Sequence, residues 1–232
     1  MKRRTSILGC GSLVILMLLS GCASETLFRS NFDPVAVGQP PSHAQAVGTA
    51  NIDGPPGSVL VVAPPVSPSG KWVEITRRND PSAIAALQGN FVQFRGAGTY
   101  TFSTILYIPS GSGIATIQAE TFGQAVTNYS GFLHIDFTQD NHVRIDDKPE
   151  TVFGTFPRDQ PFIVEVTLDI NPSSPTAHIV LSGAGASGQA DYTIIPALRP
   201  MALQFGAVRV WMGFPWTGRF DATDIVVTRK TQ

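Results

Sequence analysis

The chain has 232 residues, enough for one domain to bury a substantial hydrophobic core. Its 16 Lys and Arg nearly balance 17 Asp and Glu, and only 14% of the residues are charged. Nucleic acids and anionic membrane surfaces attract proteins through a basic face, so this composition argues against both as partners.

The beginning of the chain has the organisation of an export signal. Basic residues at 2–4 precede an apolar run at 7–19, which is shorter than the roughly 20 residues of a membrane-spanning helix. The run ends in Leu-Ser-Gly-Cys at 19–22, which resembles the lipobox of bacterial lipoproteins. The resemblance implies cleavage before Cys22, a diacylglyceryl thioether on its sulfur and a further acyl chain, such as palmitate, on its amino group. Two or more acyl chains hold a protein stably on a membrane.

The residue after the cysteine is Ala23 rather than aspartate. In enteric-type lipoproteins this favours transfer to the outer membrane. The resemblance therefore implies a lipid-anchored protein of the cell envelope, in the outer membrane of a Gram-negative bacterium.

Processing would change both the charge and the thiol content. Loss of residues 1–21 removes three basic groups and leaves 13 Lys and Arg against 17 Asp and Glu, a net charge of −4. Cys10 leaves with the signal and Cys22 is acylated, so no thiol remains for a disulfide, a metal or catalysis.

The remaining chain is rich in short β-branched runs separated by Gly and Pro, a pattern typical of all-β proteins. After a tether at 22–26, strands are expected at 27–32, 58–63 and 72–77. One short helix is expected near 81–88, because Asp80 can cap it, Pro81 suits its first position and Gly89 can end it.

The second half of the chain predicts strand after strand. The cleanest alternation of apolar and polar residues runs over 162–170. Further strands are expected at 100–108, 114–122, 132–138, 142–145, 178–181, 190–195, 203–212 and 222–228. About a dozen strands at this spacing predict a single domain over 27–232, built as an antiparallel two-sheet β-sandwich or jelly roll.

Several segments carry a resemblance to a known superfamily: LFRSNFD at 27–33, GSVLVV at 57–62, GKWVEITR at 70–77, FIVEVTLDI at 162–170, AHIVL at 177–181 and GRFDATDIVVTR at 218–229. Together they resemble the concanavalin A-like lectin/glucanase (LamG-like) superfamily. The resemblance implies that the first and last strands are neighbours in one sheet, and that a concave sheet is a candidate glycan-binding surface.

The segment HIDFTQ at 134–139 is the first candidate site. Laminarinase-type glucanases of this superfamily carry E-x-D-x-x-E on one strand. Here His134 and Gln139 occupy the two glutamate positions, and only Asp136 remains. Retaining hydrolysis needs two carboxyl groups about 5–5.5 Å apart. We therefore assign no catalytic residue and keep these three side chains as candidate ligand contacts.

Asp140, Asn141, Asp146 and Asp147 cluster around a predicted hairpin. Calcium prefers six to eight oxygen ligands, often from loop carboxylates. Asp140, Asp146 and Asp147 are therefore weak candidates for a structural calcium site, although solvated turns are the simpler interpretation. The four histidines show no zinc-binding spacing, so no other metal or cofactor is expected.

The segment WMGFPW at 211–216 is the most unusual one in the chain. Trp211, Phe214 and Trp216 offer flat aromatic faces that suit stacking on a sugar ring or anchoring a protein partner. The alternative is that they fill one end of the sandwich.

Three functions are compatible with these features. The favoured one is a membrane-tethered, non-catalytic module that binds glycan or a protein partner of the envelope. The alternatives are a polysaccharide hydrolase or lyase with other catalytic residues, and a structural or assembly component of the envelope.

Overall fold

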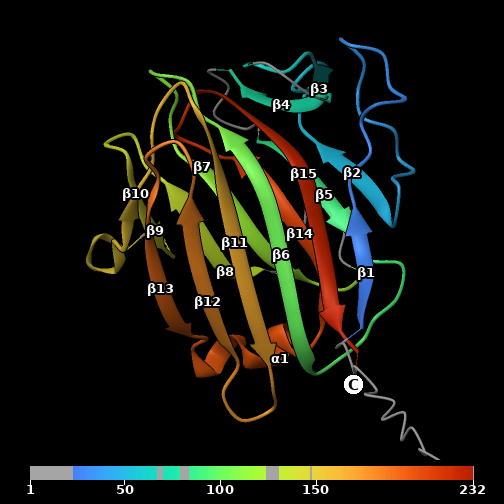
Figure 1. The fold of residues 1–232 in the computed structure, drawn as a ribbon, viewed down its shortest axis with the longest axis vertical. Coiled ribbons are helices and arrows are strands. Elements are labelled where there is room, and N and C mark those ends of the chain that lie inside the picture. Colours follow the sequence, from blue (N-terminus) through green and yellow to red (C-terminus); the bar gives the residue numbers. More distant parts are fainter. Residues whose placement is uncertain (1–22, 67–69, 79–83, 124–130, 147, 232) are drawn as a thin grey trace, which may run out of the picture.

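The computed structural model describes residues 23–66, 70–78, 84–123, 131–146 and 148–231. They form two layers of antiparallel strands with the hydrophobic core between them, as the sequence predicted (Figure 1). The predicted signal segment and the predicted lipidation site Cys22 lie outside the described residues. Among the residues described, no helix is long and apolar enough to cross a membrane.

The two layers are called sheet I and sheet II. In spatial order, sheet I consists of β2 (Thr49–Asp53), β5 (Ala85–Asn90), β14 (Phe205–Met212), β7 (Ala115–Thr121), β8 (Gly131–Phe137) and β9 (His142–Ile145). Sheet II consists of β13 (Ser187–Thr193), β12 (Thr176–Ser182), β11 (Pro161–Ile170), β6 (Gly98–Tyr107), β15 (Gly218–Lys230), β4 (Trp72–Arg77) and β3 (Val59–Val62).

Short elements connect the layers and close one end of the sandwich. β10 (Gly154–Thr155) pairs with both β9 and β13 and so joins the two sheets. The helical turns are η1 (Pro149–Thr151), η2 (Pro196–Leu198) and α1 (Arg199–Ala202). The first strand, β1 (Ser24–Arg29), pairs with the last strand, β15, which confirms that the two ends of the chain are neighbours in one sheet.

The predicted tether at 22–26 is too long, because β1 begins at Ser24. Ser24, Glu25 and Thr26 already pair with the end of β15. Strand β1 therefore begins two residues after Cys22.

The predicted helix near 81–88 is wrong for the residues of this range that the structure describes. Residues 81–83 lie outside the described residues, but Ala85–Asn90 is strand β5. This segment is buried along most of its length and pairs with β2 on one side and β14 on the other. A short apolar run buried on both faces fits a central strand as well as a helix, and its neighbours decide between them.

The core depends on aromatic side chains from both sheets. Phe205 of β14 is the centre of one cluster, with ring centroids 4.9 Å from Phe91, 5.1 Å from Tyr100 and 5.6 Å from Phe132, all in edge-on contacts. Edge-on aromatic pairs add to the stabilisation that burial gives. This packing fixes β14 against sheet II, and so determines which residues of β14 face away from the core.

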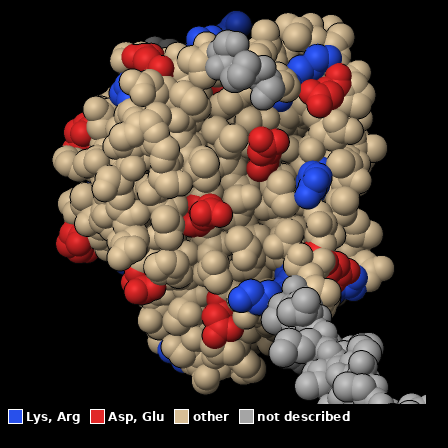
Figure 2. All heavy atoms as spheres, viewed as in Figure 1, with Lys and Arg blue, Asp and Glu red and all other residues tan. Residues whose placement is uncertain are grey.

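The outer face of sheet II is the one seen in Figure 2. It is mostly uncharged, with isolated acidic side chains and few basic ones. No continuous charged surface is visible on this side.

Candidate functional site

The outer face of sheet I carries an unusual series of polar residues. Ile117 and Ala119 of β7 and Val208 and Val210 of β14 belong to the core cluster. Successive side chains of a strand point to opposite faces, so the residues between them point away from the core. We call the outward-facing set the polar strip: Asn51, Asp53, Gln88, Thr116, Gln118, Glu120, His134, Asp136, Arg144, Arg209 and Trp211.

Strand register brings these residues into two rows across sheet I. The first row runs Asn51, Gln88, Arg209, Gln118, His134, each opposite the next. The second row runs Asp53, Ala86, Trp211, Thr116, Asp136, Arg144 in the same way. Three of the sequence-predicted residues, Trp211, His134 and Asp136, therefore lie on one face.

Arg209 is the centre of the polar strip. It is 0% exposed, and its guanidinium lies 3.5 Å from Glu120 Oε1 and 3.3 Å from Asp53 Oδ2. The same guanidinium lies 5.5 Å from the centroid of the Trp211 ring. A buried charge is tolerated only when it is paired, so these contacts compensate the burial of Arg209.

Glu120 is fully buried beside this arginine. Burial raises the pKa of its carboxyl. Two effects oppose that rise only in part: the hydrogen bond that Gln88 Nε2 donates, and the charge of Arg209.

Gln118 is 1% exposed and packs against Gly131. Any side chain at position 131 would collide with the amide group of Gln118. Within the described residues, neither polar atom of the Gln118 side chain has a hydrogen-bond partner, and the same is true of His134 Nε2.

The margin of the polar strip is more accessible than its centre. Trp211, His134, Arg144, Asn51 and Asp53 are all partly exposed. These side chains reach the surface, whereas Gln88, Gln118, Glu120 and Arg209 are at most 1% exposed. Asp136 is buried and accepts a 2.7 Å hydrogen bond from Thr116 Oγ1.

Gln139 does not join His134 and Asp136. Strand β8 ends at Phe137, and Gln139 lies exposed in the turn that leads to β9. The third position of the glucanase-like pattern is therefore occupied by a turn residue rather than by a residue of the sheet face.

Phe214 and Trp216 also lie apart from Trp211. Phe214 is 65% exposed beyond the end of β14, whereas Trp216 packs against the core. Arg77 ties this segment to β4: it donates a hydrogen bond to the carbonyl oxygen of Trp216, and its guanidinium lies 5.7 Å from the Phe214 ring centroid. The three aromatic residues therefore do not form one surface.

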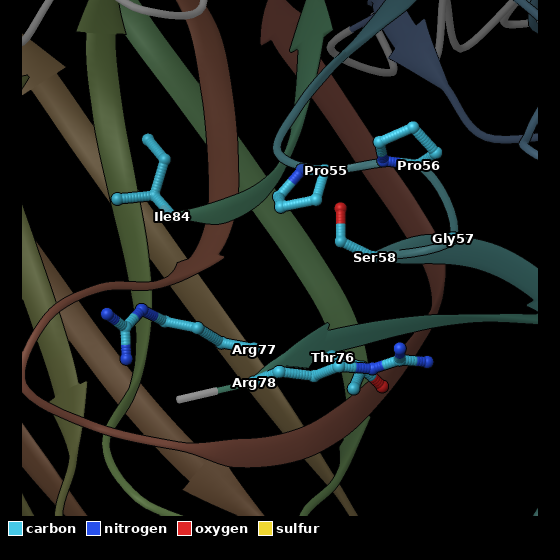
Figure 3. Close-up of a pocket in the computed structure, with 8 residues that line it drawn as sticks. All are labelled: Pro55, Pro56, Gly57, Ser58, Thr76, Arg77, Arg78 and Ile84. Carbon is cyan, nitrogen blue, oxygen red and sulfur yellow. The ribbon is translucent and has the colours of Figure 1, made fainter. Parts of the chain in front are cut away.

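Arg77 also lines a separate pocket with about 350 Å³ of empty space. Figure 3 shows the side chains of Arg77 and Arg78 leaving the end of β4 in opposite directions, with the Ser58 hydroxyl above them. The remaining lining residues are Pro55, Pro56, Gly57, Thr76 and Ile84. Because the two guanidinium groups diverge, they do not converge on one anion.

The calcium candidates do not converge in the described part of the chain. Asp140 contacts Thr138 and His142, and Asp146 accepts hydrogen bonds from the His134 backbone and the Tyr192 hydroxyl. Asp147 lies outside the described residues. Among those that are described, no group of three or more His, Cys, Asp or Glu side chains is arranged to hold a metal ion.

The sequence reasoning missed Arg209, Glu120, Gln118, Gln88 and Asp53. A signal was present, because polar residues occupy every second position of TIQAE in β7 and of VRVW in β14. What the sequence lacks is the register that brings these strands side by side.

Comparison with solved structures identifies the fold. Arcelin-5, a lectin-like defence protein from Phaseolus vulgaris, superposes with a TM-score of 0.52 at 9% identity, covering 90% of this chain and 99% of its own. An endo-1,3-β-glucanase from Streptomyces sioyaensis gives 0.52 at 13% identity, with 90% and 97% covered. Lectin II from Ulex europaeus gives 0.50 at 11% identity, with 90% and 99% covered.

No protein-family model and no curated protein sequence matches the chain. At these low identities the structural likeness shows the fold alone, which is the concanavalin A-like β-sandwich jelly roll.

Proposed function

We propose that this protein is a lipid-anchored envelope lipoprotein that binds glycan on the outer face of sheet I without cleaving it. The observation that carries the proposal is the partly exposed Trp211 ring, which lies on a polar sheet face beside the buried Arg209 ion pairs. The solved lectins and the glucanase with this fold make glycan the natural class of ligand to test.

The chemistry of the margin suits a sugar ring. A pyranose has an apolar C–H face that stacks on an aromatic ring, and hydroxyl groups that both donate and accept hydrogen bonds. Trp211 offers the aromatic face, Asp53 offers acceptor oxygens, Arg144 offers donors and His134 can offer either. Ligand pockets commonly combine an apolar surface with a few fixed polar groups in this way.

The buried centre supports this margin. Arg209, Glu120 and Gln88 lie side by side on three adjacent strands, and Arg209 also contacts Trp211 and Asp53. A preorganised surface loses less conformational entropy when it binds.

Binding without cleavage is favoured by the replacement of both glutamates of the glucanase-like pattern, by His134 and Gln139. Asp136, the one acid of that pattern that remains, also lies far from Glu120. Asp136 stands opposite Thr116, and Glu120 lies four residues further along β7, about 13 Å away at ~3.3 Å per residue. This separation exceeds the roughly 6.5–9.5 Å of inverting glycosidases and the ~5–5.5 Å of retaining ones.

Replacing Trp211 by alanine should weaken glycan binding at least about 10-fold, because loss of an aromatic side chain that stacks on the ligand costs more than about 1.4 kcal/mol. The measurement is retention of residues 23–232 on a panel of bacterial, plant and host polysaccharides by affinity electrophoresis. Phe214→Ala is the matched control: it removes an exposed aromatic residue outside the polar strip and should leave retention unchanged.

Equal losses for Trp211→Ala and Phe214→Ala would contradict this location of the site. Retention on no polymer at all would favour a protein partner, and release of new sugar ends would favour the enzyme alternative.

The proposal of a membrane anchor is based on the lipobox-like residues 19–22. Cys22→Ser should abolish lipid attachment, because the thioether can form only on the cysteine sulfur. Intact mass should show acyl chains on the wild-type N-terminal cysteine and none on the variant. A wild-type protein whose mass matches an unmodified chain would refute the anchor.

A further inference from the structure

One end of the sandwich carries an exposed apolar patch. Val92 is 64% exposed, Phe94 46% and Phe122 36%. Val92 and Phe94 lie in the segment between β5 and β6, Phe122 directly follows β7, and the Phe94 and Phe122 ring centroids are 6.1 Å apart. We call these three residues the apolar patch. Large apolar side chains that gather on a surface commonly mark a contact with a partner or a membrane.

The apolar patch lies at the end where the described chain begins. Arg95, next to Phe94, donates a 2.9 Å hydrogen bond from Nε to Glu25 Oε2 in β1. The carbonyl oxygen of Ala23 accepts a 2.9 Å bond from the Thr231 backbone, so both ends of the chain meet here. Figure 1 places the start of β1, the end of β15 and the segment leading into β6 together at the lower end of the molecule.

We propose that the apolar patch inserts into the interfacial region of the membrane to which Cys22 is anchored, and so fixes the orientation of the domain. This inference rests on the lipid anchor of the proposed function. Cys22 directly precedes Ala23, and one residue spans at most ~3.6 Å, so acyl chains in the bilayer would bring this end of the sandwich to the headgroups.

The net charge of the chain favours an apolar contact with the membrane over an electrostatic one. Without residues 1–21 the protein carries 13 basic and 17 acidic groups, so the protein as a whole is not attracted to anionic lipid. Aromatic and aliphatic side chains settle at the boundary of headgroups and acyl chains of any lipid class. Insertion should therefore occur equally well into zwitterionic phosphatidylcholine.

This orientation determines how far Trp211 lies from the membrane. Phe122 lies six residues along the chain from Thr116, which stands opposite Trp211. At ~3.3 Å per residue, Trp211 is held about 20 Å from the apolar patch along the strand direction. Sheet I would then stand upright on the membrane, with Trp211 accessible from the side.

The test uses lipidated full-length protein in phosphatidylcholine vesicles containing doxyl-labelled lipid as a quencher. Gln93→Cys places a fluorophore inside the apolar patch while retaining Val92 and Phe94. Gln39→Cys is the matched control, because its backbone bonds to Val61 of β3, at the opposite end of the sandwich (Figure 1). Cys10 is lost with the signal and Cys22 is blocked by lipid, so each introduced thiol is the only free one.

We expect the label at position 93 to be quenched several-fold more strongly than the label at position 39. Adding Val92→Ser and Phe94→Ser should reduce quenching at position 93 to the level seen at position 39. Equal quenching at the two positions in protein whose mass confirms the lipid would overturn the inference and leave the anchor intact. Absence of lipid on Cys22 would overturn the anchor and, with it, the inference.

Discussion

Replacing Arg209 by methionine should lower the free energy of unfolding by about 3–5 kcal/mol, because it leaves the carboxylates of Glu120 and Asp53 without their buried cation. Methionine retains much of the aliphatic volume, so the loss reports mainly on charge. The measurement is urea unfolding of residues 23–232, followed by far-UV circular dichroism.

Two further variants separate this effect from a simple loss of packing. The double change of Arg209→Met and Glu120→Gln should recover about 1–3 kcal/mol, because it removes the unpaired buried carboxylate. Arg219→Met breaks an ion pair with Glu74 in which the arginine side chain is 50% exposed, and should cost less than about 1 kcal/mol. If the double variant is no more stable than Arg209→Met, the ion pairs do not hold the face together.

Replacing Asp221 by asparagine should stabilise the protein at pH 8 by roughly 2–4 kcal/mol and have little effect at pH 3.5. Asp221 of β15 is 2% exposed and stands opposite Glu74. Burial first, and then the negative charge of Glu74, raise the pKa of Asp221 from 3.8 to about 7, and Arg219 opposes the rise.

The direction of this pH dependence follows from the difference between the pKa of Asp221 in the folded and in the unfolded chain. Below pH 3.8 the carboxyl is protonated in both the folded and the unfolded chain, so it costs no stability. Between pH 3.8 and about 7 the unfolded chain ionises while the folded one stays protonated, and the folded state loses stability as the pH rises. Asparagine cannot ionise, so the difference in unfolding free energy between the two proteins should grow across this window.

Comparing the two proteins at each pH cancels the other titrating groups. Glu74→Gln provides a second check. It removes the smaller cause of the pKa rise and also the ion pair with Arg219, so any gain at pH 8 should be smaller. A difference between wild type and Asp221→Asn that stays constant from pH 3.5 to pH 8 would contradict the assigned pKa.

Local patterns predicted most of the strands. The predicted strands at 72–77 and 142–145 coincide with β4 and β9, and the alternation over 162–170 matches β11 within one residue. These segments each bury one face, so period-two alternation marks them directly. Ala85–Asn90 is buried on both faces and has no alternation to mark it as a strand, so the capping residues Asp80, Pro81 and Gly89 predict a helix there instead.

The candidate site was predicted only in part. The sequence picked out His134, Asp136 and Trp211 as single residues, but nothing local relates Trp211 to Asp136, 75 positions before it. The ion pairs of Arg209 with Asp53 and Glu120 likewise depend on cross-strand register, which non-local packing decides. The aromatic residues of 211–216 are close in sequence, which predicts one shared surface. Phe214 and Trp216 instead lie beyond the end of β14, which carries Trp211.

The central claim, that glycan binds on the outer face of sheet I, is tested most directly by the indole N–H signals of the three tryptophans in an NMR titration. Trp72 is 5% exposed in sheet II, Trp216 packs against the core, and Trp211 alone of the three belongs to the polar strip. Adding a glycan that retains the protein should shift the Trp211 indole signal in a saturable way and leave the other two in place. Saturable shifts at Trp216 or Trp72 with Trp211 unchanged would contradict the claim.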